Sequence, residues 1–153
     1  MIAVSEAVYF EDFEPGVETQ LGQYRLSLAE LIEFATRYDP QPFHTDPIAA
    51  QTSLIGCLCA SGNQTFVISQ RLVYDRVYSR AAVVAGLGVD KLRFHRPVLP
   101  DENLSGHVIV ISRRKTTRWS DRGVVVIGIV TTNPRGETVA SMETSILVMC
   151  RPV

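Results

Sequence analysis

The stretch at residues 38–47, YDPQPFHTDP, holds the side chains whose types and spacing are best suited to chemistry. It places a carboxylate, Asp39, five positions before an imidazole, His44. At about 3.6 residues per turn, a helix would turn these two side chains to different faces. Pro40 and Pro42 exclude a continuous helix here, because proline disfavours helical backbone in the residue before it. We therefore expect a compact irregular loop in which Asp39 and His44 converge. A carboxylate beside an imidazole can hold a water molecule and move its protons near neutral pH.

The same residues also have purely structural interpretations. Asp39 can be the last polar residue after a helix, and His44 a surface histidine. For Asp46 and Pro47 we favour the structural interpretation, because Asp-Pro at the start of a short helical run, here expected at 47–52, is ordinary N-capping. From spacing alone, both interpretations of the Asp39–His44 pair stay open.

Length and composition indicate one globular domain covering residues 1–153, with 46% apolar and 20% charged residues. The formal net charge is -1 and no long block of like charge occurs, so we expect no nucleic-acid partner. The N-terminal residues lack the basic start and apolar core of a signal peptide, and no apolar run approaches the ~18 residues of a membrane span. We therefore expect a soluble cytoplasmic protein without membrane contact.

The three cysteines do not indicate a disulfide framework, because their number is odd. Cys57 and Cys59 have the C-x-C spacing without a second pair, so we expect no zinc site and no other metal centre. We interpret Cys57, Cys59 and Cys150 as small buried hydrophobic residues.

Two longer helices are expected besides the short helical run at 47–52. The first begins after Ser27, with Glu30 completing a capping box, and ends at Tyr38 because Pro40 follows. The second runs from Gly62 to Val77 with Ser61 as its N-cap. Its apolar residues cover more than half of its circumference, so we expect it to be largely enclosed.

Strand patterns dominate the rest of the chain, at 17–26 with a bend at Gly22, and then at 83–94, 104–117, 123–132 and 139–151. The segment 124–130 is apolar at both parities and is expected to be buried on both faces, one against the second helix and one against another subunit. The order of these elements predicts an α+β domain in which an antiparallel sheet wraps round one long central helix.

With these motifs placed, the chain resembles the MaoC-like dehydratases, the hot dog-fold family that includes the (R)-specific enoyl-CoA hydratases. The family signature D-x-N-P-x-H stands here as the sequence at 39–44, with Gln41 in place of the usual Asn. A second signature, a glycine followed by Ala-Ser at the entry to the long helix, stands at 56–62. The segments at 9–16 and 96–98 also match, so the resemblance is nearly end to end.

The resemblance implies a hydratase that adds water to trans-2-enoyl thioesters of coenzyme A, or the reverse dehydration of (R)-3-hydroxyacyl thioesters. Asp39 and His44 would activate the water and move the proton as a pair, which cannot be divided into one base and one acid. Ser61 would lie near the water or substrate, or act only as the helix cap. Gly56 and Gly62 would lie at the thioester oxyanion, near the helix amides, although Gly56 can also serve only a turn.

Coenzyme A also requires cations for its phosphates, and five basic residues cluster near one expected turn: Arg113, Arg114, Lys115, Arg118 and Arg122. The alternative is a solvated strand end. We interpret His95 and His107 as structural. No cofactor beyond the coenzyme A of the substrate is implied, and a homodimer or higher homo-oligomer is expected.

Two rival functions remain at this stage. A hot dog thioesterase shares the fold and ligand, but such enzymes commonly place a carboxylate on the central helix. Here the first turns carry Asn63, Gln64 and Thr65, and Asp75 lies too far along. The second rival is a non-catalytic acyl-CoA-binding or scaffold subunit, which Gln41 in the signature keeps open.

Overall fold

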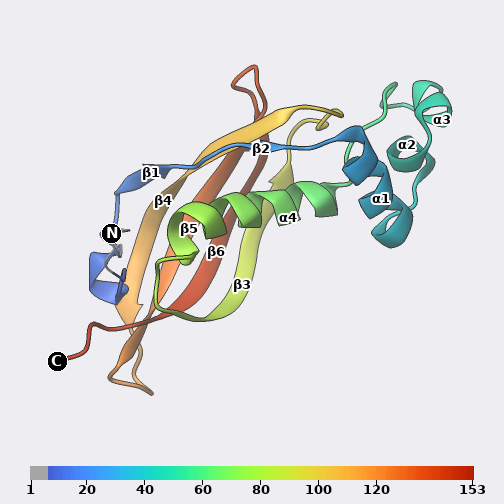
Figure 1. Ribbon diagram of the computed structural model, residues 1–153. Coiled ribbons are helices and arrows are strands. Elements are labelled where there is room, and N and C mark those ends of the chain that lie inside the picture. Colours follow the sequence, from blue (N-terminus) through green and yellow to red (C-terminus); the bar gives the residue numbers. More distant parts are fainter. Residues whose placement is uncertain (1–6) are drawn as a thin grey trace, which may run out of the picture.

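In a computed structural model that describes residues 7–153, one antiparallel sheet curves around one long helix (Figure 1). The strand order is β1-β4-β5-β6-β3, with β2 also paired to β4. The strands are β1 Glu18–Gln20, β2 Tyr24–Arg25, β3 Val83–Phe94, β4 Asn103–Lys115, β5 Arg122–Thr132 and β6 Thr138–Met149. The α+β architecture and its single hot dog domain agree with the prediction from sequence.

The four long strands lie within two residues of their predicted limits, because each is a long run with period-two patterning between clear turns. The first strand differs. The single strand expected at 17–26 is divided into β1 and β2, and both pair with β4 in antiparallel register. The division falls at 21–23, which includes Gly22, where a bend was expected.

Helix α1, Leu28–Tyr38, has the predicted limits. The Ser27 side chain accepts a hydrogen bond from the Glu30 backbone N–H, as expected for an N-cap. The other half of the capping box does not form, because the Glu30 carboxylate accepts a hydrogen bond from the Tyr24 hydroxyl instead. The strand before α1 is therefore joined to its first turn.

The proline-rich loop contains a helical turn that we did not predict. Helix α2, Pro42–Thr45, carries His44 and starts with Pro42, whose missing N–H costs nothing at the first helical position. Helix α3, Pro47–Gln51, follows directly, and the Asp46 carboxylate accepts hydrogen bonds from the backbone N–H groups of its first turn. The capping role predicted for Asp46 is confirmed.

The central helix α4, Gly62–Val73, continues as a π-helical turn, η2, at Tyr74–Tyr78. The prediction that it is largely enclosed is wrong for one face, because Val67 and Tyr74 are about half exposed. Its opposite face, with Ile68, Leu72 and Val73, is buried. Within residues 7–153, none of the helices has both the length and the apolar composition to span a membrane.

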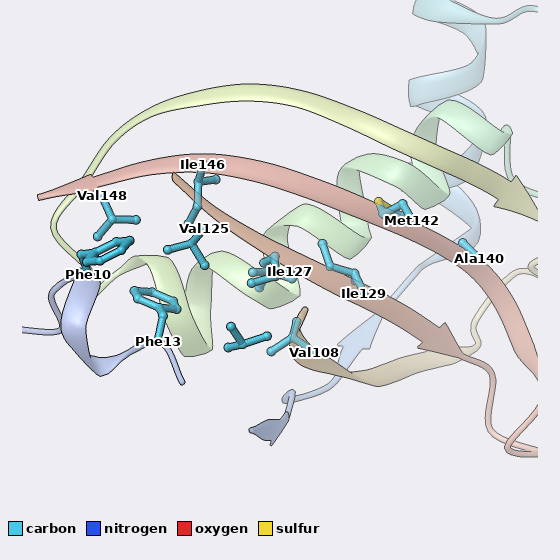
Figure 2. Close-up of a cluster of buried hydrophobic side chains, with 12 residues drawn as sticks. Phe10, Phe13, Val108, Val125, Ile127, Ile129, Ala140, Met142, Ile146 and Val148 are labelled. Carbon is cyan, nitrogen blue, oxygen red and sulfur yellow. The ribbon is translucent and has the colours of Figure 1, made fainter. Parts of the chain in front are cut away.

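A large apolar cluster fills the space between the sheet and the second half of the central helix. Figure 2 shows Phe10 and Phe13, from the short 3₁₀ helix η1 at Phe10–Asp12 and its end, beside Val125 and Val148. Along β5, Val125, Ile127 and Ile129 are buried, whereas the alternate residues Val126, Gly128 and Val130 are half-buried. Burial on both faces of this segment is thus only partial within the protomer.

The cysteines differ in their burial. Cys59 is buried, as expected, but Cys57 and Cys150 are half-buried, and all three are free thiols. Burial raises the pKa of the Cys59 thiol to about 11, so it is neutral under ordinary conditions.

Candidate active site

Asp39 and His44 converge as the proline spacing predicted. Asp39 is the C-cap residue directly after α1, and His44 lies in α2. The His44 Nε2 atom lies 3.7 Å from Asp39 Oδ2, with the two side chains 9% and 26% exposed. This separation is longer than a hydrogen bond, so each atom can still bond to a third group.

The other ring nitrogen of His44 identifies the tautomer. Nδ1 lies 2.7 Å from the backbone oxygen of Cys59, and a carbonyl oxygen only accepts hydrogen bonds. Nδ1 therefore carries a proton, and the lone pair of a neutral His44 is on Nε2. Two acceptors, Nε2 and the Asp39 carboxylate, then face each other, so the arrangement favours a proton or a water molecule between them.

Ser61 connects this pair to the central helix. Its Oγ donates a hydrogen bond to Asp39 Oδ2 over 2.6 Å and accepts one from the Asn63 backbone N–H over 3.2 Å. Ser61 is fully buried. The helix cap expected at Ser61 is thus present, and the same hydroxyl also contacts the Asp39 carboxylate.

The two glycines of the second signature have different surroundings. A Cβ on Gly62 would lie 2.6 Å from the Phe94 ring, so glycine allows that ring to lie against the first turn of α4. Gly56 has φ +77° in an exposed turn whose N–H bonds back to Ser53. An added Cβ there meets no atom within 4 Å, so its backbone conformation is what favours glycine.

A cavity of about 250 Å³ opens beside His44. Gly62 and Thr65 of α4 form one side, and Phe94, His95 and Arg96, at the end of β3, form another. Sequence reasoning did not place these three residues at the site, and it treated His95 as structural. The Arg-Pro-Val motif at 96–98 was the one available sign that these residues lie at a strand end, because Pro97 marks that end. A second cavity, of about 200 Å³, lies under Phe13 and Val77 at the other end of the molecule and holds no acid–imidazole pair.

The basic cluster does not join the site within the protomer. It surrounds the β4–β5 hairpin, at the end of the sheet opposite α1, α2 and α3 (Figure 1). Arg113 donates hydrogen bonds to backbone oxygens of Phe10 and Glu11, and Lys115 lies near Glu11 and Cys150. Arg122 pairs with Asp121, and the Arg118 guanidinium lies over Trp119.

Other groups of interest have mainly structural contacts. His107 is half-buried in β4, opposite Gln20 and Val130. Asp75 lies beyond α4 and forms an exposed ion pair with Arg71 at 2.9 Å. Within residues 7–153, no cluster of three or more His, Cys, Asp or Glu side chains is arranged to hold a metal ion.

Comparisons with known proteins agree with this fold. The family model described as MaoC like domain matches residues 12–133. A crystal structure of a MaoC-like dehydratase from Rhodospirillum rubrum superposes with a TM-score of 0.87 at 31% identity, covering 96% of this chain and 100% of that one. An (R)-hydratase from Pseudomonas aeruginosa shares the fold, with a TM-score of 0.74 at 21% identity over 95% of this chain and 88% of that one. An uncharacterised Bacillus subtilis protein is 27% identical over 90% of this chain and 96% of its own length.

Proposed function

The chain belongs to the family of MaoC-like domains, and on that premise we propose that it adds water to trans-2-enoyl thioesters of coenzyme A, or removes it from (R)-3-hydroxyacyl thioesters. The observation that supports this most is the Asp39–His44 pair beside the N-terminus of α4. A buried Ser61 links the carboxylate to the helix that can stabilise the anion. Structural similarity to (R)-hydratases supports the reaction class.

The chemistry needs one proton removed and one supplied. The water oxygen forms a bond to the β-carbon while the double-bond electrons move toward the thioester oxygen. The Asp39–His44 pair accepts the proton that the water loses, and a proton from the pair goes to the α-carbon. Nε2 of His44 is available for this transfer because the other ring nitrogen, Nδ1, is hydrogen-bonded to the backbone oxygen of Cys59.

Negative charge on the thioester oxygen requires hydrogen-bond donors. The amides of the first turn of a helix have no partner within the helix, and the helix dipole favours an anion there. Gly62 is in this turn and lines the cavity, so we propose its backbone N–H as an oxyanion donor. Gly56 lies in the preceding turn, and we propose that it shapes the loop that closes over the thioester.

The test is hydration of crotonyl-CoA, followed by loss of the enoyl absorbance. Asp39→Asn and His44→Ala are each expected to lower turnover by roughly 10² to 10⁴ while leaving the protein folded. Asp46→Asn is the matched control, because Asp46 lies in the same segment and only caps α3. Turnover at the wild-type level in both site variants would refute the proposal.

The same assay separates the two rivals. Release of free thiol from acyl-CoA, detected with a thiol-reactive dye, would indicate a thioesterase. Binding of acyl-CoA without turnover would indicate a non-catalytic subunit. The structure gives the thioesterase reading little support, because Asp75 is exposed and paired with Arg71.

The carrier phosphates require cations. Arg96 lines the cavity within the protomer and has one ion pair, at 3.7 Å to Glu137. The basic cluster lies at the opposite end of the protomer from the candidate site of that protomer. We therefore propose that it binds the carrier phosphates at the site of a neighbouring subunit; its residues are Arg113, Arg114, Lys115, Arg118 and Arg122. Arg96→Ala and Arg113→Ala, compared by KM for crotonyl-CoA at unchanged kcat, would show which cations bind the carrier, and an unchanged KM would exclude the residue concerned.

We propose that two copies associate along β3. This strand pairs with β6 on one side, and nearly all of its residues are exposed. A long exposed edge strand tends to pair with another chain. Leu87→Glu, at a site 53% exposed, is expected to shift a dimer to a monomer in light scattering, and a monomeric wild-type protein would contradict this.

A further inference from the structure

The cavity of about 200 Å³ at the end of the molecule away from His44 has no part in the proposed function. It shares no lining residue with the cavity beside His44. Its apolar lining comes from the core, since Phe13, Val108, Val110 and Ile127 belong to the large buried cluster shown in Figure 2. An apolar cavity of about 150 Å³ is already large enough to bind a small apolar molecule, so this one can hold a ligand.

Two arginines at the wall of this cavity supply positive charge. Arg76 lies in η2 and Arg80 follows two residues after its end, and both are exposed. Arg80 Nη2 donates a hydrogen bond to the backbone oxygen of Arg76 over 3.4 Å, so the two residues lie side by side. Neither forms an ion pair with any carboxylate of residues 7–153.

The carboxylate at the cavity wall does not cancel this charge. Both oxygens of Asp12 accept hydrogen bonds from Arg151 Nη2 over 2.8 Å, and one also accepts the Tyr9 backbone N–H. The Asp12–Arg151 pair is therefore neutral, and Arg76 and Arg80 leave the wall with a net positive charge. Guanidinium groups bind carboxylates through well-oriented pairs of N–H donors, so the wall suits an anionic group.

The volume of the cavity sets the length of the apolar part of a ligand. A methylene group is close in size to a water molecule, whose share of liquid volume is about 30 Å³. A cavity of about 200 Å³ therefore holds a chain of about six carbons. A ligand with this chain and an anionic end would satisfy both the lining and the wall.

We propose that this cavity binds an aliphatic carboxylate, with a chain of about six carbons inside it and the carboxylate group at Arg76 and Arg80. The inference goes beyond the proposed function, since the site is separate from Asp39 and His44 and takes a free acid in place of a thioester. A ligand there contacts η1, η2 and strand β4 together, so its binding stabilises the folded protein.

The first test locates the ligand by titrating the wild-type protein with hexanoate and following the backbone amide signals by NMR. Signals of Thr19, Val77 and Val110, which line the cavity, are expected to shift. Signals of His44 and Gly62, which line the other cavity, are expected to stay in place.

The second test varies the chain and the head group in the same titration. Among carboxylates of four to eight carbons, each added methylene should tighten binding by about fourfold, the effect of burying one methylene. This gain should stop beyond about six carbons, when the cavity is full. Hexan-1-ol should bind about tenfold more weakly than hexanoate, because it lacks the charge-assisted hydrogen bonds. Hexylammonium should bind most weakly.

Three variants assign the head-group preference. Arg76→Gln and Arg80→Gln change exposed side chains, so both are expected to fold. Combined in one protein, they should bring the ratio of the hexanoate and hexan-1-ol affinities to about one. Arg37→Gln is the matched control, because Arg37 is an exposed arginine of α1 at the other end of the molecule, and it should leave the ratio unchanged.

A further variant tests the apolar part of the site. Val77→Phe places a larger side chain at the cavity and should lower the affinity for hexanoate by about tenfold, because the ring takes the space of the alkyl chain. Thermal unfolding checks that this variant is folded. If it is not, the dependence of wild-type binding on chain length still decides.

Cavity signals that millimolar hexanoate leaves unchanged would overturn the inference. Shifts confined to His44 and Gly62 would do the same, since they would place the acid in the candidate active site. Equal affinities for hexanoate and hexan-1-ol, or a preference that the double arginine variant retains, would exclude Arg76 and Arg80 as the carboxylate site. Crotonyl-CoA hydration does not enter these measurements, so their outcome is independent of the proposed function.

Discussion

Two glycines at opposite ends of the molecule each make room for an aromatic ring, with different consequences. A Cβ on Gly123 would lie 2.2 Å from the ring of Phe10, and one on Gly62 would lie 2.6 Å from that of Phe94. Phe10 is 5% exposed and belongs to the large apolar cluster, whereas Phe94 is 48% exposed and lines the cavity beside His44. A glycine beside an aromatic ring thus belongs to the apolar core at one end and to the candidate site at the other.

The polar groups of the two ends differ in the same way. Near the termini, exposed ion pairs join the η1 segment to the rest of the chain, Asp12 to Arg151 in the last segment and Glu11 to Lys115 at the end of β4. Beside α4, fewer polar groups are more deeply buried and bonded to one another, as in the contact of Ser61 with Asp39. Exposed pairs add little stability each, while buried polar groups constrain geometry and are costly to disturb. The first end also holds the apolar core around Phe10, whereas the buried polar groups of the second end lie in the candidate site. We therefore expect changes in that core to affect stability and changes beside α4 to affect activity.

The largest effect is expected for the double variant Asp39→Asn/His44→Ala. In the proposed mechanism the two groups act as one unit. The kcat/KM of the double variant for crotonyl-CoA should therefore fall by about 10² to 10⁴, no further than that of the less active single variant. Enoyl absorbance measures the rates, and circular dichroism checks the fold. Multiplied losses in the double variant would show that the groups act independently.

Gly123→Ala is expected to have the second largest effect, and this effect is on the free energy of unfolding. The new methyl group displaces the buried Phe10 ring, so the free energy of unfolding is expected to fall by about 1–3 kcal/mol. Chemical denaturation measures this loss. The kcat/KM of the folded protein should stay within about twofold of wild type, because overpacking acts locally, and a large loss of activity would contradict the division between the two ends.

Gly62→Ala should act in the opposite way. The Phe94 ring is half exposed and can move aside, so the free energy of unfolding should change by less than about 1 kcal/mol. The displaced ring should enter the cavity and lower kcat/KM by about tenfold, as misplacement near a reacting group does. Gly22→Ala is the control, since an added Cβ there meets no atom within 4 Å. Equal activity of the two variants would show that the Phe94 ring has no role in the active site.

The smallest expected effect is the pH dependence of stability at the end of the molecule that holds Glu11 and Arg151. The Arg151 backbone N–H, together with Lys115, lowers the pKa of Glu11 from 4.5 to about 2. Because the folded-state pKa is depressed, the stability that Glu11 contributes is present above about pH 4.5 and is lost as the pH falls toward 2.

Denaturation of the wild-type protein and Glu11→Gln at several pH values checks this. The difference between their free energies of unfolding should shrink as the medium is acidified, and it should be small throughout because Glu11 is exposed. A difference that grows on acidification would contradict the assignment.

Local patterns account for the parts of the structure that were predicted well. Ser27, Asp46 and Ser61 each precede a helix that begins where a cap predicts, because capping involves only neighbouring residues. The long strands follow from alternation between turns. Helix α2 was missed because four residues are too few for a periodic pattern, and the exposed face of α4 was misjudged because apolar composition does not show what covers it.

The candidate site was predicted in part. The convergence of Asp39 with His44 follows from prolines within ten residues of chain. Phe94, His95 and Arg96 were missed because about 50 residues separate them from His44, and only sheet pairing brings strand β3 to the first turn of α4.

The amino-acid sequence by itself determined the helix starts, the strand limits, the antiparallel α+β class and the stiff loop that carries the acid and the imidazole, because these depend on forces between near neighbours. Only the tertiary structure decided which end of the sheet faces that loop and that the basic hairpin lies at the other end. These outcomes depend on how distant segments pack, and that packing is a property of the whole chain.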